Sequence, residues 1–600
     1  MSDQPAPRPT ICLTMIVRNA ATTIGDSLNS IAPHVSSWVI VDTGSDDGTR
    51  ELIRSHLAGV PGEIHERPSI TFGDDRTAAL ALAQGRGDYI WLMESDDRVV
   101  GEPDFAQLSA DVYWLRHADR GDFAWRAQVF RDGVRAQYVG LTHAFAAWDR
   151  SVIDVRLQGG YHVESLRPGS PGASEPRGGR DHEVLLADVE RDPADTRAVF
   201  ELAQSYFSRG DFVNARAWYA RRAKMGGWSA EVFYAMHRIA DSMAHLGAPW
   251  NDVLDAYLRA WEFRPTRAEP LFAIARHYFG ERRHLLAYEF AQRAASIPFP
   301  EADQLCVDDA VYTWRATDEQ AVNASWIGKP AESFELDRRV LARPELPDGD
   351  RARVAANRDT LVPTMFYAAV RYPRDLAQSL RPAGGYARDV QVVVSLIVGP
   401  DLVSTEQMLN SFLNCCKDLS RIDRFLVFDT GLSAKDRASL GERYRFLEFA
   451  RAEIGAHIEQ RPGAELAQIR EEIDGPLWLH LGQAWWFFTP ENLVTRLSAV
   501  LQAEPEVLQV GVNLDDAVRL TGTSAAEATV RRAAGTGRYL ITDRVARGPA
   551  MFDTARLDRA GGVNPADTDP IADLGRRAAA AGLRTASLDE VLCTSCTAAV

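Results

Sequence analysis

The sequence predicts two α/β domains on either side of an all-α helical repeat. Residues 9–165 alternate short apolar runs with helical patterns, which is typical of a parallel sheet covered by helices. Residues 194–365 repeat a helix-pair pattern with a period of about 35 residues, and residues 388–600 return to the first pattern. A chain of 600 residues is too long for one hydrophobic core, so separate domains are expected.

Composition and charge narrow the class of protein. The net charge of −16 argues against a general nucleic-acid binder, because neutralising phosphates requires clustered Lys and Arg. Residues 1–9 are a polar leader, expected to be disordered, and they lack the apolar core of a signal peptide. No long run of apolar residues occurs, so no membrane span is expected. These features favour a soluble cytoplasmic protein.

The first domain is expected over residues 10–165. Residues 11–17 are typical of a buried strand, and residues 19–31 of a helix with apolar side chains on one face. Residues 38–41 form a second apolar run, which ends at Asp42 in a turn rich in Gly, Ser and Asp. In parallel sheets ligands bind beyond the carboxyl ends of the strands, so Asp42 is a candidate binding residue.

A third apolar run, residues 89–93, ends abruptly in Glu94, Ser95, Asp96 and Asp97. Alternate residues of a strand face the same way, so Glu94 and Asp96 can point to one ligand. Two carboxylates together with diphosphate oxygens are a usual ligand set for Mg²⁺ or Mn²⁺, and the ion would neutralise a leaving nucleoside diphosphate. Taken alone, an acidic run after a strand is more often a solvated loop.

Four segments in this order, MIVRNA, VIVDTGSDDGT, FGDDRTAAL and WLMESDD, resemble the family 2 glycosyltransferases, which have the GT-A fold. The resemblance covers about residues 10–100 and implies an inverting transferase with a nucleotide-sugar donor. Because a UDP-sugar is the usual donor in this family, it also implies a UDP-sugar. It implies metal ligation by Glu94 and Asp96, although the family usually has Asp at the first position. The residues that it places on the donor are Arg18, Asp42, Arg76, Glu94, Ser95 and Asp96.

After Asp97 the resemblance is thinner. One stretch resembles the back half of glycosyltransferases that carry helical repeats, where a strand leads to a His-Glu pair, but here His143 is followed by Ala. His143 is a candidate third metal ligand or, equally, a packed structural residue. An inverting transferase needs a carboxylate base. The family's usual Glu-Asp pair is not visible, which leaves Asp149, Asp154 and Glu164 as candidates.

The middle of the chain resembles tetratricopeptide repeats. Residues 166–193 contain a Gly-, Pro- and Ser-rich stretch, expected to be a linker or a loop that closes over the donor. Residues 194–365 follow as helical repeats, which stack into a solenoid with a concave face. Small residues recur where two helices would cross: Ala203, Ala240 and Ala275, then Ala223, Ala260 and Ala295. The partner of this face stays open between a protein acceptor and a second copy of the chain, and a plain spacer is the alternative.

The last domain, residues 388–600, parallels the first. Asp429 in FLVFDTG occupies the place of Asp42 in VIVDTG. Counting onward by the same interval, the place of Glu94 falls on Leu481, so LGQA (481–484) replaces the acidic run, and a shift of one residue still gives no carboxylate pair. A second carboxylate pair of the family is replaced here by Pro570 and Ile571. The domain is therefore expected to be inactive; the rival interpretation is a metal-independent second active site.

The leading hypothesis is a glycosyltransferase that acts from the first domain on a protein, polysaccharide or lipid acceptor. One alternative is a non-catalytic repeat scaffold with two relic domains, and another is a transferase that recruits a protein acceptor through its repeats. Cys593 and Cys596 form a CxxC, which without a second pair is a weak signal for zinc or redox chemistry. A reduced chain is the simpler interpretation.

Overall fold

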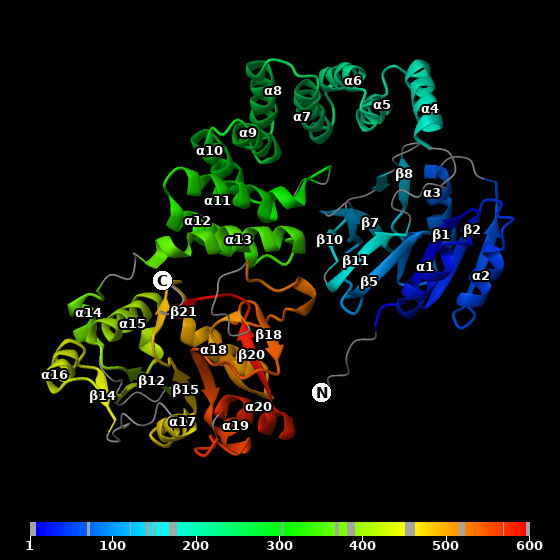
Figure 1. Cartoon of the computed structure of the whole chain (residues 1–600). Helices are drawn as coiled ribbons and strands as arrows, with labels where there is room; N and C mark the ends of the chain where they lie inside the picture. The colour runs from blue at the N-terminus through cyan, green and yellow to red at the C-terminus, as the bar shows by residue number, and fades with distance from the viewer. Residues whose placement is uncertain are drawn as a thin grey trace. The chain divides into compact units, whose positions relative to one another are not determined.

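The computed structural model describes residues 8–68, 72–119, 122–139, 145–148, 152–157, 159–166, 177–301, 303, 305–366, 371–380, 391–450, 462–514, 522–567 and 569–595. The chain divides into two compact units. Unit 1 comprises Met1–Tyr278 and Phe290–Ala316, and unit 2 comprises Phe279–Glu289 and Thr317–Val600. The division falls within the helical stretch, so each unit contains one α/β part and some of the helices (Figure 1).

Unit 1 begins with a mixed sheet. Four parallel strands come first: β3 (Gly62–Glu66), β2 (Ser37–Asp42), β1 (Ile11–Val17) and β4 (Tyr89–Glu94). Beyond β4 lie β7 (Asp122–Arg131), β6 (Val112–Asp119), β11 (Gly159–Ser165) and β5 (Asp97–Pro103), while β10 (Asp154–Arg156) pairs with β6. A separate ribbon joins β8 (Ala136–Val139) to β9 (Phe145–Trp148). The expected mixed α/β class is confirmed for this part.

Strand β1 is apolar on both faces because helices cover both. Leu13 and Met15 belong to the core that contains Leu28 of α1 (Ile24–Ile31), whereas Cys12 belongs to the core that contains Leu80 of α3 (Phe72–Ala83). Helix α2 (Thr49–His56) follows β2 and packs against α1. A strand buried on both sides reads as a continuous apolar run, which is what the sequence has here.

The helical stretch consists of consecutive helices joined by short turns. In unit 1 these are α4 (Arg177–Arg191), α5 (Thr196–Ser208), α6 (Phe212–Met225), α7 (Ser229–His245) and α8 (Trp250–Phe263). Helices α9 (Glu269–Gly280) and α10 (His284–Ala295) each have residues in both units. Residues 177–191, expected to belong to a linker, form α4 instead. Leu185 and Val189, one helical turn apart, are buried against Leu202 of α5, and this burial stabilises the helix.

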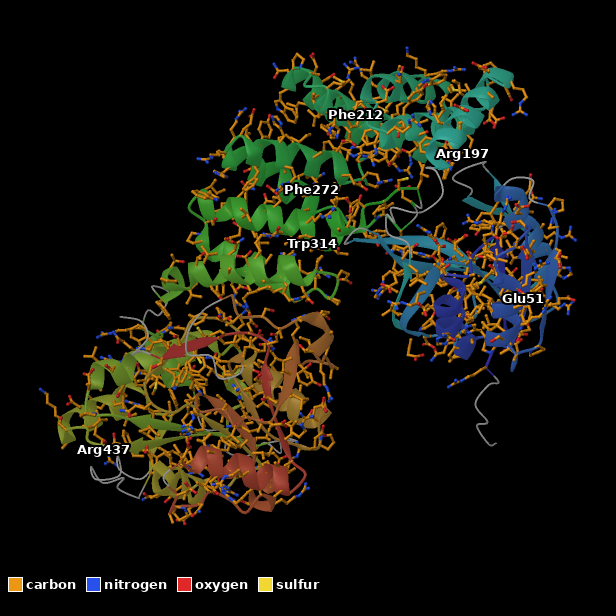
Figure 2. The ribbon with its side chains drawn as sticks, turned by 45° about the vertical axis from the view of Figure 1, so that its right-hand side comes forward. Glu51, Arg197, Phe212, Phe272, Trp314 and Arg437 are labelled. Carbon is orange, nitrogen blue, oxygen red and sulfur yellow. The ribbon has the colours of Figure 1, made fainter. Side chains whose placement is uncertain are left out.

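The repeat pattern corresponds to helix pairs. Ala203, Ala240 and Ala275 are fully buried, as expected where two helices approach closely. Asp195 caps α5 by accepting hydrogen bonds from the backbone N–H groups of Arg197 and Ala198, and Asp211 caps α6 in the same way. Figure 2 labels Arg197 and Phe212, which lie in the first turns of these two helices. The expectation of helical repeats is therefore confirmed.

Unit 2 contains the remaining helices of the stretch, α11 (Ala316–Trp326, in unit 2 from Thr317), α12 (Pro330–Leu341), α13 (Asp348–Met365) and α14 (Arg374–Ser379). Its sheet has the order β14 (Leu447–Phe449), β13 (Arg424–Asp429), β12 (Val392–Val398), β15 (Leu477–His480), β19 (Ala550–Asp553), β17 (Val507–Gly511), β20 (Arg584–Leu588) and β18 (Tyr539–Thr542). The helices around it are α15 (Leu402–Cys415), α16 (Ala434–Arg443), α17 (Pro462–Glu471), α18 (Leu493–Ala503), α19 (Thr554–Arg559) and α20 (Pro570–Ala580).

The two sheets share one spatial order. In each sheet, four parallel strands are followed by one antiparallel strand, which is β7 in the first sheet and β19 in the second. The next two strands are parallel to each other: β6 and β11 in the first sheet, β17 and β20 in the second. The outermost strands differ in chain order, because β5 directly follows β4 whereas β18 directly precedes β19. The sequence parallel between the two ends of the chain thus extends to strand order.

A small ribbon near the C-terminus joins β16 (Trp485–Phe487) to β21 (Cys593–Ser595). Cys593 is fully buried there, and its sulfur lies 3.5 Å from Oδ1 of Asn513. Its environment is that of a packed side chain, and Cys596 lies outside the described residues. Within the described ranges, no helix is long and apolar enough to span a bilayer.

Candidate functional site

The acidic residues predicted from the sequence lie at the carboxyl edge of the parallel strands in unit 1. The ladder pairs Val17 of β1 with Asp42 of β2, and Ile16 of β1 with Glu94 of β4. Asp42 and Glu94 therefore flank the end of β1, with Cα atoms about 10 Å apart across two strand spacings. The structure brings these two predicted residues together.

Asp42 is buried and holds its own turn. Its Oδ1 accepts hydrogen bonds from the backbone N–H groups of Gly44 at 2.9 Å and Ser45 at 2.8 Å. The guanidinium of Arg50, from α2, lies 3.2 Å from the other carboxylate oxygen. Gly44 has a φ of +106°, a backbone conformation that favours glycine. This carboxylate thus fixes the loop that leads from β2 into α2.

That loop is hydrogen-bonded to the loop after β1 by residues that the sequence analysis missed. Asn19, with a φ of +49°, donates its backbone N–H to Ser45 Oγ and accepts from the backbone N–H of Asp46, both at 3.0 Å. Thr49 Oγ1 accepts from the backbone N–H of Ala20 at 2.8 Å. The exposed Arg18 directly precedes Asn19. The signal available in the sequence was an Asn shortly after an apolar strand, since Asn tolerates a positive φ better than most residues.

Glu94 and Arg76, both predicted to bind the donor, form an ion pair with each other. Arg76 comes from α3, and its guanidinium lies 5.1 Å from the ring centroid of Tyr138. The side chains of Arg76 and Glu94 keep 14% and 23% of their surface exposed, so the pair is accessible. A guanidinium at this edge is suited to hold phosphate oxygens, which it can bind in a bidentate way.

The turn after β4 is fixed on both sides. Thr23 Oγ1 donates to the carbonyl of Ser95 at 3.1 Å, and the carbonyl of Asp96 accepts from the backbone N–H of Leu166 at 2.7 Å. Asp97 is buried, and burial together with the charges of Glu94 and Asp96 raises its pKa to about 7. Three carboxyl groups are therefore crowded at one turn, and the proton on Asp97 relieves part of their repulsion.

The carboxylates of this turn supply only part of the ligand set of a divalent cation. Carboxylate oxygens of Glu94 and Asp96 are the hard ligands that Mg²⁺ and Mn²⁺ prefer. Among the residues that the structure describes, however, no group of three or more His, Cys, Asp or Glu side chains is placed to hold a metal ion. These residues suit an ion whose remaining ligands are diphosphate oxygens and water. His143, the predicted third ligand, lies outside the described residues.

Asp154, a candidate base, does not lie at this edge. It pairs in β10 with Val112 of β6, and the ladder continues through Phe130 of β7 to Ile90 of β4. Because Ile90 precedes Glu94 by four residues and β10 is three strands away from β4, Asp154 and Glu94 are about 20 Å apart. Asp154, one of the three candidate bases, therefore lies on the ladder row of Ile90 rather than at the end of β4, and its role as a base stays a prediction.

Glu164 lies at the same edge as Glu94. It belongs to the end of β11, where the following Ser165 pairs with Asp97. Its carboxylate forms an ion pair with Arg98 and keeps 31% of its side chain exposed. Asp149, the third candidate, lies outside the described residues. Of the three carboxylates proposed from the sequence, Glu164 is the described one that is near the acidic turn.

The second sheet reproduces the Asp42 turn. Oδ1 of Asp429 accepts hydrogen bonds from the backbone N–H groups of Gly431 at 2.9 Å and Leu432 at 2.7 Å. Arg437 of α16 lies 3.6 Å from its other oxygen, as Arg50 lies beside Asp42. The equivalence of Asp429 and Asp42, predicted from the sequence, therefore includes the hydrogen bonds and the ion pair.

The acidic turn has no counterpart in the second sheet. Ser395 pairs with His480 as Thr14 pairs with Leu92, so the residue at the place of Glu94 is Gly482. Counting the same number of residues from Asp429 predicted Leu481, one residue too early, because the connections between the strands differ in length in the two sheets. The corrected register still places no carboxylate there, and the side chain of Gln483 lies against Gly399 at the end of β12.

His480 was not singled out by the sequence analysis. Its Nδ1 lies 2.8 Å from Ser395 Oγ, which also accepts a hydrogen bond from the Trp478 indole at 2.7 Å. Burial lowers the pKa of His480 to about 4, so its imidazole is neutral near pH 7. A small cavity of about 160 Å³ at this place is lined by His480, Gln509, Phe552 and Pro570 among others.

No family model matches the chain, and no curated protein matches its sequence. Solved structures similar to parts of it are MamA (TM-score 0.23, 16% identity, covering 27% of this chain and 86% of that chain), MamA from Desulfovibrio magneticus RS-1 (0.22, 12%, 27% and 83%) and YrrB, a TPR protein with an unusual peptide-binding site (0.21, 13%, 28% and 77%). The helix pairs are defined by the packing of consecutive helices within this chain.

Proposed function

We propose that the carboxyl edge of the first sheet binds a nucleotide sugar and that the protein is a glycosyltransferase. The observation that carries this proposal is the convergence of Asp42, Glu94 and Asp96 at the carboxyl ends of β2 and β4, the parallel strands on either side of β1, beside Arg76. Ligands of open parallel sheets bind at this edge. The four sequence segments that resemble family 2 glycosyltransferases supply these same residues.

Each residue has a definite part in the proposal. Asp42 fixes the turn at the end of β2, where the family resemblance places the nucleotide base. Arg18 and Arg76 supply positive charge for the diphosphate, which is a UDP group by the same resemblance. Glu94 and Asp96 would hold Mg²⁺ or Mn²⁺, which when bound neutralises charge on the leaving diphosphate. Glu164 is the described carboxylate best placed to accept the acceptor's proton.

Titration calorimetry with UDP and Mn²⁺ tests donor binding, and hydrolysis of UDP-glucose, UDP-galactose and UDP-N-acetylglucosamine tests the chemistry. Glu94→Gln and Asp96→Asn are expected to weaken Mn²⁺-dependent binding at least 10-fold. Glu102→Gln is the matched control, because Glu102 is an exposed carboxylate in β5 of the same sheet. Unchanged Mn²⁺-dependent binding in both Glu94→Gln and Asp96→Asn would refute the site.

A second candidate function is a non-catalytic scaffold, in which the helix pairs bind a partner protein and both sheets are relics. The helical repeats and the absence of a carboxylate at Gly482 favour it. It predicts no binding of UDP with either Mn²⁺ or Mg²⁺ in the same calorimetry.

Recruitment of a protein acceptor by the repeats is a third possibility, and it is compatible with the first. Trp228 and Phe263 are each 46% exposed on the helical stretch. Under this hypothesis Trp228→Ser and Phe263→Ser lower transfer to protein while leaving donor hydrolysis unchanged. Equal transfer by the variants and the parent chain would argue against recruitment at these positions.

A further inference from the structure

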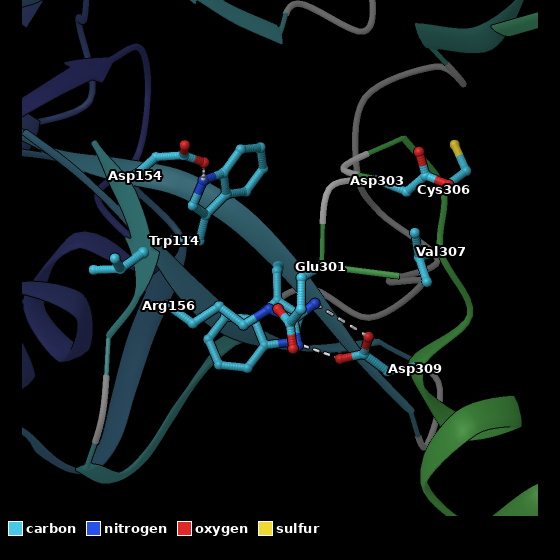
Figure 3. A pocket seen from close by; sticks show the side chains of 10 residues that line it. Trp114, Asp154, Arg156, Glu301, Asp303, Cys306, Val307 and Asp309 are labelled. Atoms are coloured by element: carbon cyan, nitrogen blue, oxygen red, sulfur yellow. Dashed lines mark hydrogen bonds and ion pairs between the residues drawn. The ribbon is translucent and has the colours of Figure 1, made fainter. Parts of the chain in front are cut away.

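Unit 1 contains a cavity away from the carboxyl edge, where β6, β7 and β10 meet the segment that follows α10 (Figure 3). Its volume is about 170 Å³. The sheet contributes two indole rings and a guanidinium, and the segment 301–309 contributes carboxylates and an apolar side chain. The residues used below are Trp114, Trp125, Asp154, Arg156, Glu301 and Asp309.

The polar groups of this cavity hold one another in place. The Trp114 indole donates to Asp154 Oδ2 at 2.7 Å, and the Trp125 indole donates to Asp309 Oδ2 at 2.5 Å. Arg156 lies 3.5 Å from the other oxygen of Asp309. Figure 3 shows these contacts as dashed lines, within the sheet between Trp114 and Asp154 and from the sheet to Asp309. Side chains fixed in this way lose little conformational freedom when a ligand binds.

Arg156 is also held by aromatic rings on two sides. Its guanidinium carbon lies 4.7 Å from the ring centroid of Trp125 and 4.1 Å from that of Phe299. A guanidinium stacked in this way keeps its N–H groups in a fixed plane, from which they can donate. The cavity therefore combines planar donors and acceptors with indole walls.

The charges on the segment are mostly neutralised within the protein. Asp303 is buried in ion pairs with Arg264 and Arg267, and Asp309 is paired with Arg156. The lining therefore does not act as a free acidic cluster. What it offers is an apolar wall from Trp114, Trp125 and Val307 and a rim of fixed polar groups.

We propose that this cavity binds one pyranose unit of a carbohydrate. A pyranose has an apolar C–H face that suits an indole ring, and hydroxyl groups that both donate and accept hydrogen bonds. Carboxylates at Asp154 and Glu301 can accept from those hydroxyls, and the guanidinium of Arg156 can donate to them. Aromatic walls with a few convergent polar groups are typical of small-ligand sites.

The cavity does not hold the reacting sugar. Asp154, which lines it, is about 20 Å from Glu94, on the ladder row of Ile90 rather than at the carboxyl edge. A carbohydrate here would be a distal unit of a long acceptor or product. This role rests on the proposed function, whereas binding of the carbohydrate does not.

The test uses the full chain with maltotetraose, cellotetraose and chitotetraose as probes, and measures binding by saturation-transfer NMR and tryptophan fluorescence. At least one probe is expected to bind, with affinity lowered 10-fold or more by Asp154→Asn and by Trp125→Phe, which removes the indole donor but keeps an aromatic ring. Trp326→Ala, which removes an exposed indole outside the cavity, is expected to leave binding unchanged.

Three outcomes overturn the proposal: no probe binds, binding survives both Asp154→Asn and Trp125→Phe in folded protein, or spermidine or a lysine-rich peptide binds the cavity in place of the saccharides. Circular dichroism establishes that each variant is folded. If a saccharide binds but UDP does not, only the proposed transferase function is refuted. Failure of the carbohydrate site and failure of the proposed function are therefore distinguishable.

Discussion

Asp97 shows how one buried carboxyl group links the acidic turn to stability. It is buried beside Glu94 and Asp96, and its pKa is raised from 3.8 to about 7, first by burial and then by those charges. The backbone N–H of Glu94, three residues earlier, donates to Asp97 Oδ2 at 3.4 Å. Since the folded state binds the proton more tightly than the unfolded state, ionising Asp97 opposes folding.

The free energy of unfolding of the parent protein should therefore fall as pH rises from about 4 to about 7. Asp97 contributes to this fall on the order of 1.4 kcal/mol per pH unit. Asp97→Asn keeps an oxygen for the Glu94 N–H and cannot ionise, so its stability should fall less. Urea unfolding of both proteins at pH 5 and pH 7.5 measures the difference. Equal pH dependence in the two proteins would contradict the assignment.

At the scale of elements, the helix pairs are joined by buried ion pairs as well as by apolar contacts. Arg222 of α6 is fully buried, and its guanidinium lies 2.8 Å from Glu231 of α7. Arg197 of α5 lies 2.6 Å from the same carboxylate, so Glu231 connects three helices. A buried charge that loses its partner is strongly destabilising, whereas removing both partners costs less.

Arg222→Met is expected to destabilise unit 1 by about 3 kcal/mol, because Glu231 loses one of its two guanidinium partners. The double variant Arg222→Met/Glu231→Gln should be less destabilised than the sum of its single variants. Chemical unfolding followed by circular dichroism provides the double-mutant cycle. Additive effects would indicate that the pair contributes no coupling energy.

At the scale of the whole molecule, the division into two units predicts two cooperative unfolding transitions.

Within unit 2, Arg338 of α12 forms an ion pair with Glu590, which lies just after β20. It also lies 2.9 Å from Glu491, which lies just before α18. Arg496 of α18 lies 3.0 Å from both carboxylates. The arginines hold the pKa of Glu590 well below its usual range, so this carboxylate is ionised in the folded protein.

In differential scanning calorimetry, Arg338→Met is expected to lower the temperature of one transition by several degrees and leave the other unchanged, because the contact is internal to unit 2. UDP with Mn²⁺ should raise only the transition that Arg338→Met leaves unchanged. Lys417→Met serves as a control for removing a positive charge from unit 2. A single transition, or equal shifts of both, would contradict independent units.

Much of the architecture could be predicted from local pattern. Strands β1, β2 and β4 are continuous apolar runs that stop at polar turns, so their ends and the grouping of Asp42 with Glu94 followed from the sequence. Helical periodicity gave the repeats, because the apolar spacing of each helix is local. The loss of the acidic turn in the second sheet was also visible, since it needs only the absence of carboxylates near Leu481.

The two α/β parts, the helical stretch and the carboxylates at one sheet edge were predictable from the sequence, because they depend on residues close together in the chain. Tertiary structure alone decided the pairing of Arg76 with Glu94, the position of Asp154 far from that edge and the Gly482 register. Strand pairing joins residues distant in sequence, and no local pattern specifies which strand will be the neighbour. The acidic turn remains the candidate site, and its ion pair and crowded carboxyl groups are properties of the fold.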